Sequence, residues 1–164
     1  MAILQSSYTE NVAKGFPGMI ANGETSNRIS RTCESAGGIA FGAPVYRGSG
    51  DHGCTGTVGT LATFYGFAVA TTALGALPGA DADEYQQYDN VTIITSGAVY
   101  VTVTGSVTDG AAITIGTGAG AADGIGATAS DATHIATGWV ADETVTNGIC
   151  RICLLYTSPS PRDS

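Results

Sequence analysis

The feature that most constrains the fold is a repeated pattern of short apolar, β-branched runs separated by clusters of Gly, Asp, Asn and Thr. In the clearest run, Val99 to Thr104, Val alternates strictly with Tyr or Thr. This period of two residues is typical of a strand that buries one face, here Val99, Val101 and Val103. Short strands at roughly 8–12-residue spacing with turn residues between them indicate a sandwich or barrel. We therefore predict an all-β body, a small β-sandwich or barrel of short, mainly antiparallel strands.

Seven strands are expected in this body, at residues 39–47, 62–70, 91–95, 98–104, 111–115, 134–141 and 149–152. The segment Thr95-Ser-Gly97 separates two of them, and Gly favours the positive φ that tight turns require. We predict a hairpin turn there. Trp139 lies within an apolar strand and is predicted to belong to the core rather than to a ligand platform.

Composition excludes several classes of protein. Gly contributes 24 of the 164 residues, about twice its usual share of ~7%. A coiled coil or long-helix protein would instead be rich in Ala, Glu, Lys, Leu and Arg. Only 6 Lys and Arg stand against 14 Asp and Glu, which argues against nucleic-acid binding because phosphates are neutralised by clustered cations. No run approaches the ~18 apolar residues of a membrane span. We expect neither nucleic acid nor a membrane as a partner.

The N-terminal region differs from the rest of the chain. Residues 1–36 show little hydrophobic periodicity and are interrupted by Gly, Pro and Asn, so they cannot bury a continuous apolar face. Positions 1–47 carry four cations and three acids, whereas positions 48–152 carry one cation and ten acids, a net charge of −9. We therefore expect an extended N-terminal arm at 1–36 and a β-rich body at 37–152.

The last twelve residues, 153–164, form a Pro-rich, patternless tail. Residues 153–163 match the translation of a transposase-type sequencing adapter at every position. Such a segment is excluded from fold reasoning. We expect 153–164 to be a non-native appendage that interrupts the natural reading frame; the alternative is a genuine disordered tail.

Three groupings of reactive residues lack the arrangement that a site requires. A Cys–His nucleophile pair usually draws on distant segments, so we predict that Asp51-His52-Gly53-Cys54 is a turn with a solvated histidine. The stretch Gly116 to Gly124 fails the dinucleotide and phosphate-loop patterns and is predicted to be a flexible hairpin loop. The acids Asp81, Asp83 and Glu84 could gather Ca²⁺, but a solvated charge run is the simpler interpretation. We predict no catalytic residue, metal or cofactor, and no enzyme activity.

Without the tail the chain has three cysteines, Cys33, Cys54 and Cys150, whose spacing fits no zinc pattern. A Cys33–Cys54 disulfide is one interpretation. The other is reduced structural thiols in a protein that folds in a cytoplasm.

The order of motifs over residues 10–152 resembles the structural cement proteins, or head decoration proteins, of tailed bacteriophages. In that family a Pro-Gly-hydrophobic-Ala arm leads to a Phe-Gly-x-x-Val-x-Arg-Gly strand, then to Gly-x-Ala-Val and Gly-x-Val-x-Val strands. The corresponding residues here are Pro17-Gly-Met-Ile-Ala21, Phe41-Gly-Ala-Pro-Val-Tyr-Arg-Gly48, Gly66-Phe-Ala-Val69 and Gly97-Ala-Val-Tyr-Val101. The individual motifs are weak, and their order and spacing carry the resemblance.

The resemblance implies a virion protein on the exterior of the capsid, made in the cytoplasm of the bacterial host. It implies that the protein clamps neighbouring major capsid protein subunits, often as a homotrimer. The arm would then meet the capsid, with the candidate contact residues Lys14, Phe16, Met19, Ile20, Arg28 and Arg31.

A second hypothesis is another β-rich phage virion module, such as a fibre or carbohydrate-binding domain. A sugar site requires exposed aromatic residues near acids or amides, and Tyr85, Tyr88 and Asp89 are the candidates.

Overall fold

The computed structural model describes residues 14–21, 25–71 and 83–154. Within these ranges the regular structure is almost entirely β, with two short 3-10 helices, which confirms the predicted all-β class. The elements are β1 (Asn27–Cys33), β2 (Ile39–Ala40), β3 (Pro44–Arg47), β4 (Gly53–Thr55), η1 (Leu61–Thr63), β5 (Phe64–Ala68), β6 (Glu84–Tyr85), β7 (Asn90–Val107), β8 (Ala112–Gly116), η2 (Gly118–Asp123), β9 (Ile125–Gly126), β10 (His134–Ala141) and β11 (Val145–Leu154). No helix in the described ranges is long and apolar enough to cross a membrane.

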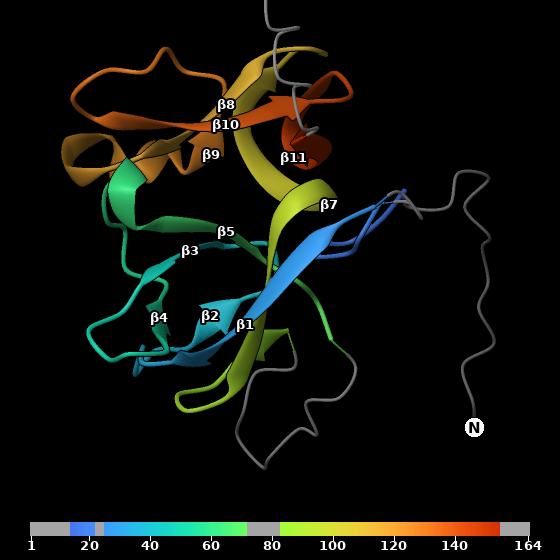
Figure 1. The fold of residues 1–164 in the computed structure, drawn as a ribbon. Coiled ribbons are helices and arrows are strands. Elements are labelled where there is room, and N and C mark those ends of the chain that lie inside the picture. Colours follow the sequence, from blue (N-terminus) through green and yellow to red (C-terminus); the bar gives the residue numbers. More distant parts are fainter. Residues whose placement is uncertain (1–13, 22–24, 72–82, 155–164) are drawn as a thin grey trace, which may run out of the picture.

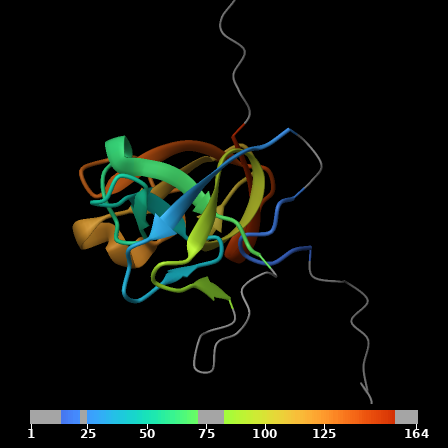
Figure 2. The ribbon, with the colours of Figure 1, turned by 60° about the horizontal axis from the view of Figure 1, so that its bottom comes forward.

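Five strands form a closed ring, which we call the ring. β1 pairs with β4, β4 with β3, β3 with β5 and β5 with β7, and β7 pairs back to β1. Only β1–β4 is parallel among these pairings. The β1–β7 ladder runs from Asn27 opposite Ser96 to Thr32 opposite Asn90, and the two strands lie alongside each other in both views (Figures 1 and 2). β2 and β6 form a separate two-stranded sheet.

The second half of β7 begins another group of strands, which we call the arc. It pairs with β11 from Gly97 to Val107, and β10, β8 and β9 follow in order. β9 returns to β7, because a Cβ built on Gly126 would lie 3.0 Å from the Thr104 carbonyl oxygen. No strand pairing joins β9 to β7 within the described residues, so the arc is open. Figure 1 shows β7 running through both groups, with the ring below and the arc above.

The predicted hairpin turn at residues 95–97 is wrong, because β7 continues through it. Gly97 has a φ of +124°, a value that side-chain-bearing residues rarely adopt. It bends the strand without reversing it. Before Gly97, β7 pairs with β1 and β5, and after it β7 pairs with β11. A single glycine therefore joins the two halves of the molecule.

Each group of strands has its own apolar cluster. The cluster on the ring side contains aliphatic residues, two cysteines and one aromatic side chain, and it includes Ile39 of β2 and Tyr85 of β6: Cys33, Ile39, Val45, Cys54, Ala68, Tyr85, Val91 and Ile93. The arc buries more large side chains, among them Trp139, which is 1% exposed. Phe67 of β5 packs edge-on against Trp139 at 5.3 Å between ring centroids and connects the two groups. The expected core position of Trp139 is confirmed, as is the inward alternation of Val99, Val101 and Val103.

The structure also adds detail at both ends of the predicted body. Residues 27–33, which were expected in the arm, form β1 and complete the ring. This strand carries exposed polar residues, so its hydrophobic pattern is weak, and its main-chain pairing places it in the ring. Cys153 and Leu154, expected in the tail, continue β11 opposite Ala98 and Gly97. Main-chain pairing to an existing strand does not depend on side-chain identity. Residues 1–13 and 155–164 lie outside the described residues.

Candidate functional site

Residues 14–21, which we call the arm segment, lie along one edge of β7. Gly18 donates its N–H to the Tyr100 carbonyl at 2.8 Å, and the Tyr100 N–H donates to Met19 at 2.9 Å. Ala21 donates to Ala98 at 3.0 Å, and Ile20 forms an isolated bridge with Val99. The described part of the predicted arm thus adds a short strand-like stretch to the sheet of its own chain.

Glycine makes this close approach possible. A Cβ on Gly15 would lie 2.6 Å from the ring of Tyr100, so the arm backbone rests directly on that side chain. Gly18 has a φ of +79°, and a Cβ there would meet the Ala70 nitrogen at 2.7 Å. Ala70 in turn donates its N–H to the Gly18 carbonyl at 2.8 Å. The arm segment is therefore held between β7 and the end of β5.

An ion pair attaches the start of the arm segment to the arc. Lys14 Nζ lies 2.8 Å from Glu143 Oε2, in the turn between β10 and β11. The other carboxylate oxygen of Glu143 accepts the Arg151 N–H at 2.7 Å. Partial burial would raise the pKa of Glu143, but the hydrogen bonds from Lys14 and Arg151 outweigh it and lower that pKa. The hydrogen bond to Glu143 raises the pKa of Lys14.

The six candidate contact residues do not form one patch. Phe16 is 53% exposed, whereas Ile20 packs against the apolar cluster of the arc. Arg28 and Arg31 occupy positions of opposite parity on β1 and therefore face opposite sides of the strand. Arg28 is exposed, and the Arg31 guanidinium lies 5.5 Å from the centroid of the Tyr65 ring. Met19 is partly exposed and lies between Phe16 and Ile20 along the arm segment.

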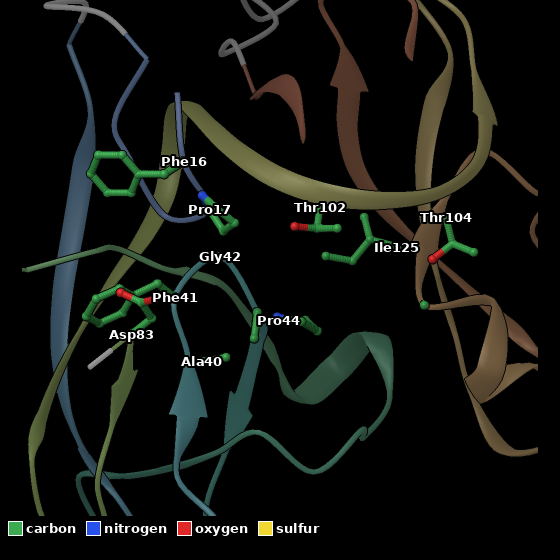
Figure 3. A pocket seen from close by; sticks show the side chains of 12 residues that line it. Phe16, Pro17, Ala40, Phe41, Gly42, Pro44, Asp83, Thr102, Thr104 and Ile125 are labelled. Atoms are coloured by element: carbon green, nitrogen blue, oxygen red, sulfur yellow. The ribbon is translucent and has the colours of Figure 1, made fainter. Parts of the chain in front are cut away.

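An apolar groove of about 540 Å³ opens beside Phe16. Figure 3 shows the arm residues Phe16 and Pro17 at one end of the groove and Thr104 and Ile125 at the other, below the ribbon of β7. Its lining residues are Phe16, Pro17, Ala40, Phe41, Gly42, Ala43, Pro44, Asp83, Thr102, Thr104, Gly124 and Ile125. Sequence reasoning selected Phe16 from this set for capsid contact but not the β2–β3 turn, which was expected inside one continuous strand.

The structure separates the histidine and the cysteine of the Asp51-His52-Gly53-Cys54 stretch. Cys54 is fully buried in β4, whereas His52 is exposed in the preceding turn. Burial raises the pKa of Cys54 to about 12, so its thiol is not an activated nucleophile. Cys33 and Cys54 lie opposite each other in the β1–β4 ladder, and both are free thiols in this structure.

The Gly-rich stretch from 116 to 124 connects the antiparallel strands β8 and β9, which confirms the predicted hairpin connection, and it contains η2. His134 lies between two carboxylates, with Nδ1 3.0 Å from Asp131 Oδ1 and Nε2 3.0 Å from Asp123 Oδ2. His134 is only 8% exposed. The hydrogen bonds to Asp131 and then to Asp123 raise the pKa of His134. These contacts connect η2 and the loop before β10 to β10 itself.

The remaining candidates do not assemble into a site. Asp81 lies outside the described residues, and no group of three or more His, Cys, Asp or Glu within the described ranges could hold a metal ion. Of the aromatic residues considered for sugar binding, Tyr85 is buried and donates its hydroxyl to the Val69 carbonyl. Tyr88 is 78% exposed, and Asp89 accepts the Gln86 N–H at 2.8 Å.

Comparison with known proteins identifies the family. No curated protein matches the chain. The fold is similar to that of a chain from the capsid of Myoviridae phage XM1, with a TM-score of 0.67 and 12% sequence identity, over 96% of this chain and 100% of that one. At this identity the similarity shows a shared fold. Residues 4–155 match the family described as structural cement protein (E217 gp24/Pam3 gp6). Because this match covers most of its length, the chain belongs to the phage structural cement protein family.

Proposed function

We propose that this protein binds the exterior of the phage capsid and bridges neighbouring major capsid protein subunits. The observation that carries the proposal is the family match over residues 4–155. A cement protein stabilises a shell by contacts, and a rigid β framework suits this role because it presents the same surface to every copy of its partner.

The proposed capsid-facing side is supported by the distribution of charge and by the exposure of residues near the N-terminus. Positions 48–152 carry one cation and ten acids, so most of this region is suited to solvent. The exposed Phe16 and the exposed cation Arg28 lie in the N-terminal part of the chain. Lys14 contributes less because Glu143 already pairs with it. We therefore assign the capsid-facing side to the arm segment and the adjoining β1.

Assembly as a homotrimer would strengthen this attachment. Three linked copies make the second and third contacts intramolecular, which raises avidity without any new type of contact. Synthesis in the host cytoplasm agrees with the buried thiols of Cys33, Cys54 and Cys150, none of which forms a disulfide in the structure.

Deleting residues 1–21 tests the capsid-facing side. The deletion stops before β1, because β1 completes the ring. We expect binding to expanded, cement-free shells, measured by co-sedimentation, to fall by about tenfold or more, while circular dichroism still reports a folded β protein. Deletion of residues 155–164 is the matched control and should leave binding unchanged. Full binding by the 1–21 deletion would contradict the assignment.

A further inference from the structure

The groove coincides with an uncovered part of the β7 edge. The main-chain groups of Tyr100 on this edge bond to the arm segment. In a strand, residues two apart direct their N–H and C=O groups to the same side, so those of Thr102 also face this edge. Beyond Tyr100, no strand pairs with this edge as far as Val107 in the described parts of the chain. The opening lies between the end of the arm segment and β9.

The walls of the groove select for a particular kind of occupant. An open strand edge accepts an extended backbone, which gains main-chain hydrogen bonds by adding a strand. Phe16, Phe41 and Pro44 provide apolar walls, and Ile125 forms the far end. The exposed Asp83 is the charged residue of the lining. Its carboxylate favours a cation on the occupant.

We propose that the groove receives a short extended segment of the capsid protein, which adds to the β7 edge at Thr102. This segment places an apolar side chain between Phe16 and Phe41 and a Lys or Arg beside Asp83. The inference rests on the proposed function and names the part of the molecule that performs it. The arm segment already pairs with Tyr100 on this edge, so the capsid segment would lie next to it along β7.

Four single variants test the docking surface on expanded, cement-free shells. Phe16→Ser removes an apolar wall, and Asp83→Lys reverses the charge. Each should weaken binding about tenfold, as loss of a central contact does. The matched controls lie outside the groove. Leu61→Ser changes an apolar residue that is 57% exposed, and Asp51→Lys reverses the charge of an exposed residue. The controls should bind within twofold of the wild type, and melting temperatures should show that all four variants fold.

A photo-crosslink identifies the occupant. Replacing Phe16 with p-benzoylphenylalanine keeps an aromatic ring in the wall, and irradiation on shells should join it to an extended capsid peptide with an apolar residue near a Lys or Arg. A cross-link to another copy of this chain, or to residues 1–13 of the same chain, would overturn the inference.

The outcomes separate the inference from the proposed function. Wild-type protein that fails to bind shells would overturn the proposed function and the inference together. Wild-type binding with groove variants as tight as the controls would overturn the inference alone.

Discussion

The ring and the arc differ in whether the edges of their strands are paired. Every strand of the ring has a paired neighbour on both edges, because β1 joins β4 on one side and β7 on the other. The arc lacks a strand pairing between β9 and β7 in the described residues, and the arm segment covers only part of the edge that this leaves. An unpaired edge is a template for another chain. The fully paired ring therefore has no edge strand left for another chain, whereas the arc leaves part of the β7 edge open in the described residues.

The strongest test of the connection between the two groups is Trp139→Ala. Trp139 is 1% exposed in the arc and packs on Phe67 of the ring. Truncating a buried Trp typically lowers the free energy of unfolding by about 3–5 kcal/mol, and we expect a loss of this size in urea denaturation. Val140→Ala, on the next and more exposed residue of β10, should cost less than about 1 kcal/mol. A loss below that value for Trp139→Ala would mean that the ring and the arc are stabilised separately.

The bend that joins the two groups is tested by Gly97→Ala. The positive φ of Gly97 disfavours a side chain, and a Cβ there would lie 2.7 Å from the Ser26 Cβ. We expect the free energy of unfolding to fall by about 1–3 kcal/mol. Gly37→Ala is the control, because a Cβ at Gly37 meets nothing within 4 Å. Equal stability of the two variants would show that β7 does not depend on the bend.

The pH dependence of the arc is a smaller effect, and His134→Gln isolates it. The raised pKa of His134 means that its stabilising contribution is full below its ordinary pKa of 6.5 and is lost as the pH rises through the raised value. Asp131, whose pKa is lowered to about 2, contributes above its ordinary 3.8 and loses this contribution as the pH falls toward 2. The difference in melting temperature between wild type and His134→Gln should therefore shrink as the pH rises above 6.5. A difference for His134→Gln that stays constant across this pH range would contradict the assignment.

Local patterns in the sequence predicted the arc better than the ring. The alternation of Val99, Val101 and Val103 and the position of Trp139 depend on one strand at a time, and both were predicted correctly. The ring depends on β1 and on its parallel pairing with β4. The exposed polar residues Arg28 and Ser30 weaken the hydrophobic pattern by which β1 could be predicted. Such pairing between distant segments leaves little trace in local periodicity.

The course of β7 and the residues of the groove could not be predicted from the sequence. A positive φ is compatible with a reversal of the chain and with a bend, so Gly97 alone could not distinguish a hairpin from a continuous strand. The groove brings together the arm segment, the β2–β3 turn, β7 and β9, which are distant in sequence. Phe16 could be selected because it lies in the resemblance to the family, but the partners around it follow only from the three-dimensional arrangement.

We propose that this capsid-stabilising protein attaches to the outside of the shell through its N-terminal side and the open edge of the arc. A cryo-electron microscopy reconstruction of expanded shells saturated with the protein tests it most directly. We expect density on the outer surface that bridges neighbouring capsid subunits, with an additional capsid strand beside Thr102. Density on the inner surface, or outer density that contacts the capsid only through the β3–β4 turn of the ring, would contradict it.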